Sequence, residues 1–117
     1  MGPPESFGVR RPLRFLAHKL ELDDQQIEQL AKILDELKTE RAQAAVDDRR
    51  TLAEFADGLA GETFDLTKAA AAGDRRVDSS RRLRDAVIRA LQQLHGVLRP
   101  EQRSKLAYLI RSGVLQV

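Results

Sequence analysis

The sequence contains no cysteine, which excludes disulfide bonds, thiolate nucleophiles and cysteine-ligated metals and gives no indication of the redox compartment. Aromatic residues make up only 4% of the chain, so aliphatic side chains must fill any core. No window approaches the roughly 18 consecutive apolar residues that a membrane-spanning helix needs. The start of the chain also lacks the basic and apolar pattern of a secretory signal. With 117 residues, we expect one domain, which excludes separate catalytic and cofactor domains.

Catalytic motifs are missing as well. The sequence has no glycine-rich phosphate loop and no nucleophile motif, and Ser79 and Ser80 stand in a run of arginines without a nearby histidine. Paired acids such as Asp23 and Asp24 are typical of helix caps and solvated helix faces. We therefore expect a protein that is not an enzyme and that needs no cofactor.

Charge is distributed unevenly along the chain, although the net charge is only +2. Residues 8–20 carry four bases and no acid, residues 21–65 carry thirteen acids against five bases, and residues 66–117 carry eleven bases against four acids. Such asymmetry can indicate a nucleic-acid surface, but an acidic helix packed beside a basic helix produces the same count. We favour the intramolecular interpretation, because a helix-turn-helix reader needs a compact trihelical core and the aromatic residues do not cluster for base stacking.

Apolar periodicity and capping signals predict four helices. Residues 1–11 are expected to form a flexible arm, residues 12–113 a single helical domain, and residues 114–117 a tail. Gly73 is expected to leave the third helix unbroken, and Pro100 to open the fourth. The expected helices cover residues 12–20, 24–58, 66–98 and 101–111.

The two long helices are joined by a short turn and must run antiparallel, so the numbers of facing residues should add to about 125. The expected seam contains Ile27, Leu34, Leu52, Phe55 and Leu59 from the second helix and Leu66, Ala69, Gly73, Val77, Leu91 and Leu98 from the third. Four polar residues, Arg41, Asp48, Ser80 and Arg84, fall on this seam in its middle. Two thin helices that bury so little rarely stand alone in water, and we therefore predict a homodimer.

The starts of the second and fourth helices carry similar sequences, Leu22-Asp23-Asp24-Gln25-Gln26 and Leu98-Arg99-Pro100-Glu101-Gln102, and the hairpin places them at the same end. Twin L-T-x-x-Q motifs on a four-helix hairpin resemble the Spy/CpxP family of periplasmic proteins, whose metal-related relatives include ZraP and CnrX. The likeness covers about residues 10–112. It implies an all-α fold, with a long antiparallel helical hairpin and short first and fourth helices in a cradle-shaped dimer. It also implies a periplasmic location, with an export signal that this sequence does not include.

Each motif has a physical interpretation as a helix cap. Its leucine packs into the core, and its second residue caps the helix. Its glutamine side chain reaches back to the capping residue, as in a capping box. Asp23 can replace threonine as the acceptor, but Arg99 cannot, so the second cap must rely on Pro100, Glu101 and Gln102. The motif residues are Leu22, Asp23, Gln26, Leu98, Pro100 and Gln102.

Members of the family act as ATP-independent chaperones, as brakes on envelope-stress kinases, or as metal-responsive sensors. A chaperone needs a surface that is partly apolar and partly cationic in order to hold clients weakly, and arginine suits such a surface. The candidate client-binding residues are Arg10, Arg11, Arg14, Phe15, Arg75, Arg76, Arg81 and Arg82. The resemblance implies unfolded or misfolded proteins as partners, and a sensor kinase as a further partner if the chain is such a brake.

Metal sensing, or modulation of an envelope-stress kinase, is the alternative function on the same scaffold. A metal site requires convergent imidazole or carboxylate ligands. His18 is followed by Glu21 at i+3, and His95 lies near the end of the third helix. These three residues are the candidate metal ligands, and the competing interpretation is that both histidines are ordinary surface residues.

Overall fold

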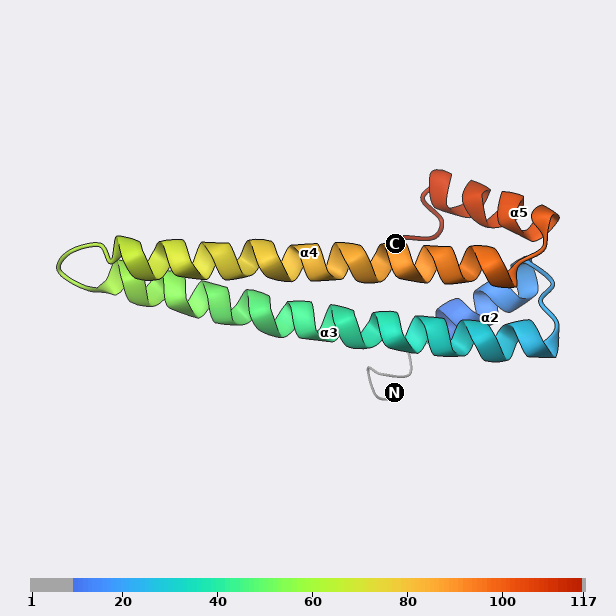
Figure 1. Cartoon of the computed structure of the whole chain (residues 1–117), viewed down its shortest axis with the longest axis horizontal. Helices are drawn as coiled ribbons and strands as arrows, with labels where there is room; N and C mark the ends of the chain where they lie inside the picture. Colours follow the sequence, from blue (N-terminus) through green and yellow to red (C-terminus); the bar gives the residue numbers. More distant parts are fainter. Residues whose placement is uncertain (1–9, 117) are drawn as a thin grey trace. The chain divides into compact units, whose positions relative to one another are not determined.

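The structure is a computed structural model that describes residues 10–116, with every side chain except that of Arg10. These residues form four helices (Figure 1). They are α2 (Arg10–Lys19), α3 (Asp24–Ala60), α4 (Leu66–Val97) and α5 (Pro100–Arg111). Residues 10–116 contain no strand, so the predicted all-α class is confirmed. None of these four helices is long and apolar enough to cross a membrane.

The first helix begins earlier than predicted. α2 starts at Arg10, two residues before Pro12, so the arm expected over residues 1–11 is wrong at its last two residues. Pro12 is tolerated inside the helix because an N–H group in the first turn has no intrahelical partner to lose. Residues 1–9, which make up the rest of the expected arm, lie outside the described residues.

The later helix boundaries agree with the sequence signals. α4 begins at Leu66, where the Asp65 carboxylate accepts a hydrogen bond from the Lys68 N–H at 3.0 Å. It passes through Gly73 without a break, as predicted. After α5 the chain turns at Gly113, whose φ of +82° lies in the left-handed region that favours glycine.

The described residues form two compact units, each described by itself below. The four-helix unit contains residues 10–38 and 87–116, and the two-helix unit contains residues 39–86. The two-helix unit includes the loop 61–65 that joins α3 to α4. In each unit α3 and α4 pack side by side and run antiparallel, which confirms the predicted helical hairpin.

Leucine dominates the core of the four-helix unit, to which all four helices contribute. Leu16 and Leu30 are its most deeply buried members. The core residues are Leu16, Leu20, Leu30, Ile33, Ala90, Leu94, Leu98, Leu106 and Leu109. Because burial of one leucine side chain contributes roughly 1.5–3 kcal/mol, this unit has a substantial hydrophobic source of stability.

Small side chains form the contact between the two helices of the two-helix unit. Thr51 and Gly58 are buried on α3, and Ala72, Ser79 and Ala86 are buried on α4. Seven residues separate neighbours on each helix, which is the spacing of a coiled-coil seam. A Cβ atom on Gly58 would lie 3.3 Å from the backbone oxygen of Asp65, in the loop before α4, and 3.9 Å from the Cβ of Ala69 on α4, so there is little room for a side chain at this end of the seam.

The predicted register is confirmed, but the predicted seam is wrong in the two-helix unit. Numbers of paired residues add to 125 for Asp57 with Lys68 and to 124 for Asp48 with Arg76, while the two other ion pairs between the helices add to 129, which is within about one helical turn of the predicted value. The large apolar residues expected in the seam are instead exposed: Leu52 at 52%, Leu59 at 74%, Leu66 at 69% and Val77 at 49%. Of the polar residues expected there, Arg41, Ser80 and Arg84 are exposed and Asp48 is half-buried. The helices are rotated so that small residues meet, because these permit the closest approach of the two backbones.

Candidate functional site

The glutamines of the twin motifs meet at the end of the four-helix unit. Gln26 Nε2 donates a hydrogen bond to Gln102 Oε1 at 2.8 Å, and Gln102 Nε2 donates one back to Gln26 Oε1 at 3.2 Å. Both side chains are buried, with 7% and 2% of their surface exposed. We call this reciprocal amide pair the glutamine clasp.

Gln26 also closes its own helix start and the end of α4. Its Oε1 accepts a hydrogen bond from the Asp23 N–H at 3.0 Å, and Asp23 Oδ1 accepts one from the Gln26 N–H at 2.8 Å. This reciprocal bonding confirms the predicted capping box. Gln26 Nε2 further donates to the backbone oxygen of Val97, the last residue of α4, at 3.1 Å.

Gln102 repeats this arrangement at the start of α5. Its Oε1 accepts a hydrogen bond from the Arg99 N–H at 2.9 Å, and its Nε2 donates to the backbone oxygen of Leu20, just after α2, at 3.0 Å. Gln26 therefore joins the start of α3 to the end of α4, and Gln102 joins the start of α5 to the end of α2. The clasp links all four helix ends where carbonyl and N–H groups would otherwise lack partners.

The second motif departs from the first at Arg99, as the sequence predicted. Arg99 has no acceptor for the Gln102 N–H, so only half of a capping box forms, and Pro100 occupies the first helical position. The Arg99 guanidinium instead donates to Glu101 Oε1 at 2.8 Å. This bond lowers the pKa of Glu101 and raises that of Arg99. The leucines of the motifs behave as expected, since Leu98 is buried in the core and Leu22 packs against it.

A family model described as LTXXQ motif family protein matches residues 9–109, a range that includes both motifs. The chain belongs to the LTXXQ motif family. This family includes periplasmic proteins of the Spy/CpxP type, so the resemblance found in the sequence is confirmed. No curated protein and no solved structure gives a significant match to the chain.

The two-helix unit of this LTXXQ protein is crosslinked by ion pairs of one polarity. In every ion pair between α3 and α4 that we identify among residues 39–86, the acid lies on α3 and the base on α4. These pairs are Asp47 with Arg82, Asp48 with Arg76, Glu54 with Arg75 and Asp57 with Lys68. The intramolecular interpretation of the uneven charge is therefore confirmed.

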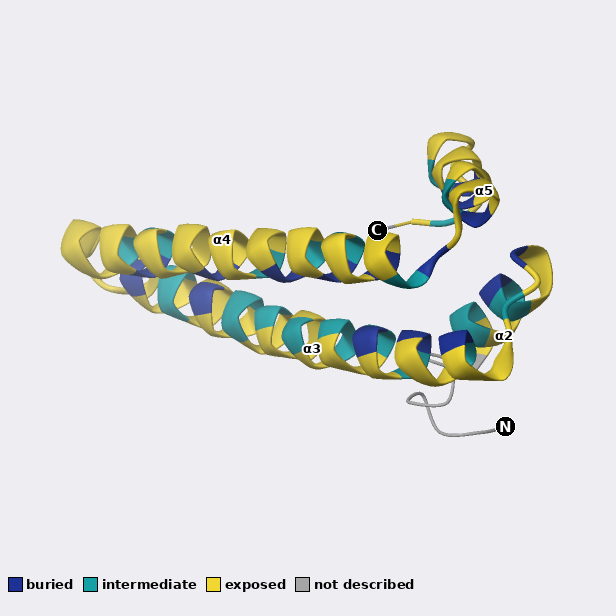
Figure 2. Ribbon diagram, turned by 45° about the vertical axis from the view of Figure 1, so that its right-hand side comes forward, coloured by how far each residue is buried: buried dark blue, intermediate teal, exposed yellow. Residues whose placement is uncertain are grey.

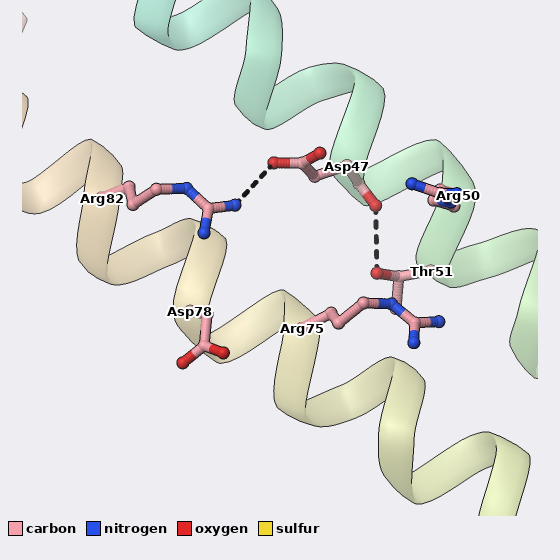
Figure 3. Close-up of a pocket in the computed structure, with 6 residues that line it drawn as sticks. All are labelled: Asp47, Arg50, Thr51, Arg75, Asp78 and Arg82. Carbon is pink, nitrogen blue, oxygen red and sulfur yellow. Dashed lines mark hydrogen bonds and ion pairs between the residues drawn. The ribbon is translucent and has the colours of Figure 1, made fainter.

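Several of these charges gather on one side of the seam, which we call the ion-pair side (Figure 3). Asp47 accepts hydrogen bonds from Ser79 Oγ at 2.8 Å, from Gln43 Nε2 at 3.0 Å and from Arg82 Nη2 at 3.2 Å. The bond from Ser79 contributes most to lowering the pKa of Asp47, followed by that from Gln43. A hollow of about 170 Å³ on this side is lined by Asp47, Arg50, Thr51, Arg75, Asp78 and Arg82.

The opposite flank of the seam presents exposed apolar side chains and arginines, and we call it the apolar face. At 100° per residue, Leu52 and Phe55 lie on this flank of α3, and Ser80 on this flank of α4. The Arg76 guanidinium lies 6.0 Å from the centre of the Phe55 ring. A hollow of about 390 Å³ continues along α4, lined by Arg76, Val77, Ser80, Arg81 and Arg84. The apolar residues that we assign to the face are Leu52, Phe55 and Leu59 on α3 and, turned further from the seam, Leu66 and Val77 on α4; all but the half-buried Phe55 are exposed. Figure 2 shows how little of α3 and α4 is buried.

The predicted client-binding arginines of α4 do not form one cluster. Arg75 and Arg82 lie on the ion-pair side, bonded to acids of α3, whereas Arg76 lies on the apolar face. Arg81 lines the hollow beside Arg76 and also pairs with Asp78. Residues four and seven apart share a face of a helix while adjacent residues do not, which explains why the run separates.

The predicted client-binding residues of α2 belong to the four-helix unit. Arg11 and Arg14 are exposed, and Phe15 is half-buried against the leucine core with Lys19 Nζ 6.0 Å from its ring centre. The side chain of Arg10 lies outside the described part of the chain. Whether these residues bind clients stays a prediction.

The apolar residues of the exposed face are the candidate functional residues that the sequence did not identify, because their spacing placed them in the seam. The heptad of small residues that includes Thr51 and Ser79 was the signal that could have revealed them.

The candidate metal ligands do not assemble into a site. His18 and His95 are exposed, and Glu21 lies in the turn after α2 with a φ of +53°. Within residues 10–116, no group of three or more histidine or acidic residues could hold a metal ion.

Proposed function

We propose that this LTXXQ protein is an ATP-independent periplasmic chaperone of the stress response, which binds unfolded clients on the apolar face of its two-helix unit. The observation that carries this proposal is the exposure of large apolar side chains beside arginines. Leu59 and Leu66 are 74% and 69% exposed although each belongs to a well-formed helix of a folded unit. Exposed apolar surface of this kind is typical of a binding site.

The chemistry of the face suits weak and reversible binding. Full burial of one leucine contributes roughly 1.5–3 kcal/mol, and partial burial by a mobile client contributes less. Arginines such as Arg76 and Arg84 can lie over apolar groups with their stems and pair with carboxylates through their guanidinium groups. A client can therefore be held by a few contacts and released without nucleotide hydrolysis, and no catalytic step is proposed.

A homodimer is a further part of the proposal. The two-helix unit buries mainly small residues such as Ala72, Ala86 and Thr51, and an isolated pair of helices with so little apolar burial is marginally stable in water. A second copy would supply additional burial. Sedimentation equilibrium across a range of concentrations tests this, and a protein that remains monomeric at the highest concentration contradicts it.

Aggregation of a denatured client, followed by light scattering, tests the chaperone function. We expect the wild-type protein to suppress scattering without nucleotide, and the double variant Leu59→Ser/Leu66→Ser to suppress it several-fold less. Val46→Ser is the matched control, because Val46 is 47% exposed on α3 but lies away from the apolar face. No suppression by a several-fold excess of wild-type protein would refute the function, and equal loss in the control would refute the assignment of the face.

A further inference from the structure

Arg76 contacts both an acid and an aromatic ring on the apolar face. Its Nε and Nη2 atoms both donate to Asp48 Oδ1, at 3.0 and 2.5 Å. The same guanidinium group lies 6.0 Å from the centre of the Phe55 ring. Arg76 also lines both hollows of this face, the one along α4 and a smaller one of about 80 Å³ beside Asp48. A carboxylate bound to Arg76 is therefore placed directly next to apolar side chains.

The pair formed by Arg76 and Asp48 is exposed, which makes it easy to exchange. The side chains of Arg76 and Asp48 are 44% and 48% exposed, and an exposed ion pair contributes little net stability. Asp47, its neighbour on α3, has a side chain only 21% exposed and accepts hydrogen bonds from three side chains. Of the two adjacent acids, Asp47 thus bonds to residues at the seam and on the ion-pair side, whereas Asp48 forms an ion pair with Arg76 on the apolar face.

We propose that Arg76 binds carboxylates of client segments, and that Asp48 is an internal competitor that occupies Arg76 when no client is bound. The inference rests on the proposed chaperone function and names its ligand class, an apolar segment that carries Asp or Glu next to large apolar side chains. The client carboxylate replaces that of Asp48 at the guanidinium group, while its apolar neighbours contact Leu52, Phe55 and Val77. Because one ion pair is exchanged for another, the net gain is small and release stays fast.

A client segment fits this face better than a second copy of the chain. Arg76, Arg81 and Arg84 follow one another along the hollow of α4. In an isologous contact the same row would lie in both surfaces, and like charges facing each other across an interface oppose association. An acidic, apolar segment meets the same row with charges of opposite sign.

The test measures the affinity of a fluorescent peptide rich in leucine and glutamate, and of the same peptide with glutamine in place of glutamate, by anisotropy. Asp48→Asn removes the competitor, and we expect it to tighten binding of the glutamate peptide by about two- to five-fold, the range an exposed ion pair can supply. Arg76→Gln should weaken binding of the glutamate peptide by a similar factor and leave the glutamine peptide unchanged. In Arg76→Gln, the further change Asp48→Asn should have no effect, because the two residues act as one unit.

Asp57→Asn is the matched control, since Asp57 is an exposed acid of α3 that also pairs with a base of α4 and its replacement changes the net charge equally. Equal tightening by Asp57→Asn and Asp48→Asn would overturn the inference, as would unchanged affinity in Asp48→Asn. A shift of a monomer–dimer equilibrium by Arg76→Gln, without a change in peptide affinity, would assign the face to a second copy and overturn it too. If the wild-type protein binds neither peptide and suppresses no aggregation, the proposed function itself fails.

Discussion

The glutamine clasp should be a major source of stability, and Gln102→Leu tests its contribution. Leucine fills a similar volume but offers no hydrogen bond. The substitution removes the hydrogen bonds that Gln102 makes with three groups: the Arg99 N–H, the Leu20 carbonyl oxygen and the side-chain amide of Gln26, which keeps its bonds to Asp23 and Val97. Each such loss in a buried position costs about 1 kcal/mol or more, so we expect the free energy of unfolding to fall by about 3 kcal/mol. At roughly 4 °C per kcal/mol for a chain of this size, the Tm should fall by about 12 °C.

Equilibrium unfolding in urea, followed by circular dichroism at 222 nm, measures this loss, and an unchanged m-value would show that the same surface unfolds. Gln25→Leu is the matched control, because Gln25 is an exposed glutamine at the start of α3, next to Gln26 of the clasp, and should change stability by at most about 0.5 kcal/mol. The double variant Gln26→Leu/Gln102→Leu should lose less than the sum of the single variants, since both remove the same amide pair. A loss below about 1 kcal/mol in Gln102→Leu, or strict additivity in the double variant, would refute the clasp.

Three further predictions concern the helix boundary at α5 and the two-helix unit. Arg99→Thr supplies the missing acceptor at the start of α5 and should raise the free energy of unfolding by about 1 kcal/mol; a urea titration that shows no gain contradicts this. Gly73→Ala, where a Cβ meets nothing within 4 Å, should stabilise the chain by roughly 0.5–1 kcal/mol, whereas Gly58→Ala should destabilise it because its Cβ would lie 3.3 Å from the backbone oxygen of Asp65. A higher free energy of unfolding in both variants would contradict the close packing at Gly58. Ser79→Ala should raise the pKa of Asp47 towards its ordinary value of 3.8, as measured by NMR titration. Because the pKa of Asp47 is lower in the folded state than its ordinary value of 3.8, the ionised Asp47 contributes to stability above pH 3.8. This contribution is lost as the pH falls through the folded-state pKa. A difference in the free energy of unfolding between wild type and Ser79→Ala that persists below that pKa would contradict the role of this hydrogen bond.

Local chemistry made the later helix boundaries and the caps at the two motifs predictable. The capping box of Asp23 and Gln26 and the incomplete cap at Arg99 depend on residues three positions apart, and both were predicted correctly. The reciprocal pairing of Gln26 with Gln102 was not predicted, because it depends on how two helix starts are placed in space. Nothing in either motif alone indicates that its amide also reaches the end of another helix.

The two-helix unit shows why a correct register does not fix the rotation of the helices. Leu52 and Leu59 have the spacing of a core stripe, and so does the stripe of small residues one position before them, at Thr51 and Gly58. Hydrophobicity favours the first stripe and close backbone approach favours the second. Sequence periodicity cannot decide between them, because the free energy of close helix contact depends on the partner helix, where Ala72 and Ser79 form the matching stripe.

The same repeat has a consequence for how the chain can mispair. Small residues recur every seven positions on both helices, and so do the charges, at Asp47 and Glu54 on α3 and at Lys68, Arg75 and Arg82 on α4. A slip of one heptad would therefore still bring small side chains against small ones and acids against bases. The tight connection 61–65 forbids that slip, so an insertion of a few residues there is expected to release a second, nearly isoenergetic alignment.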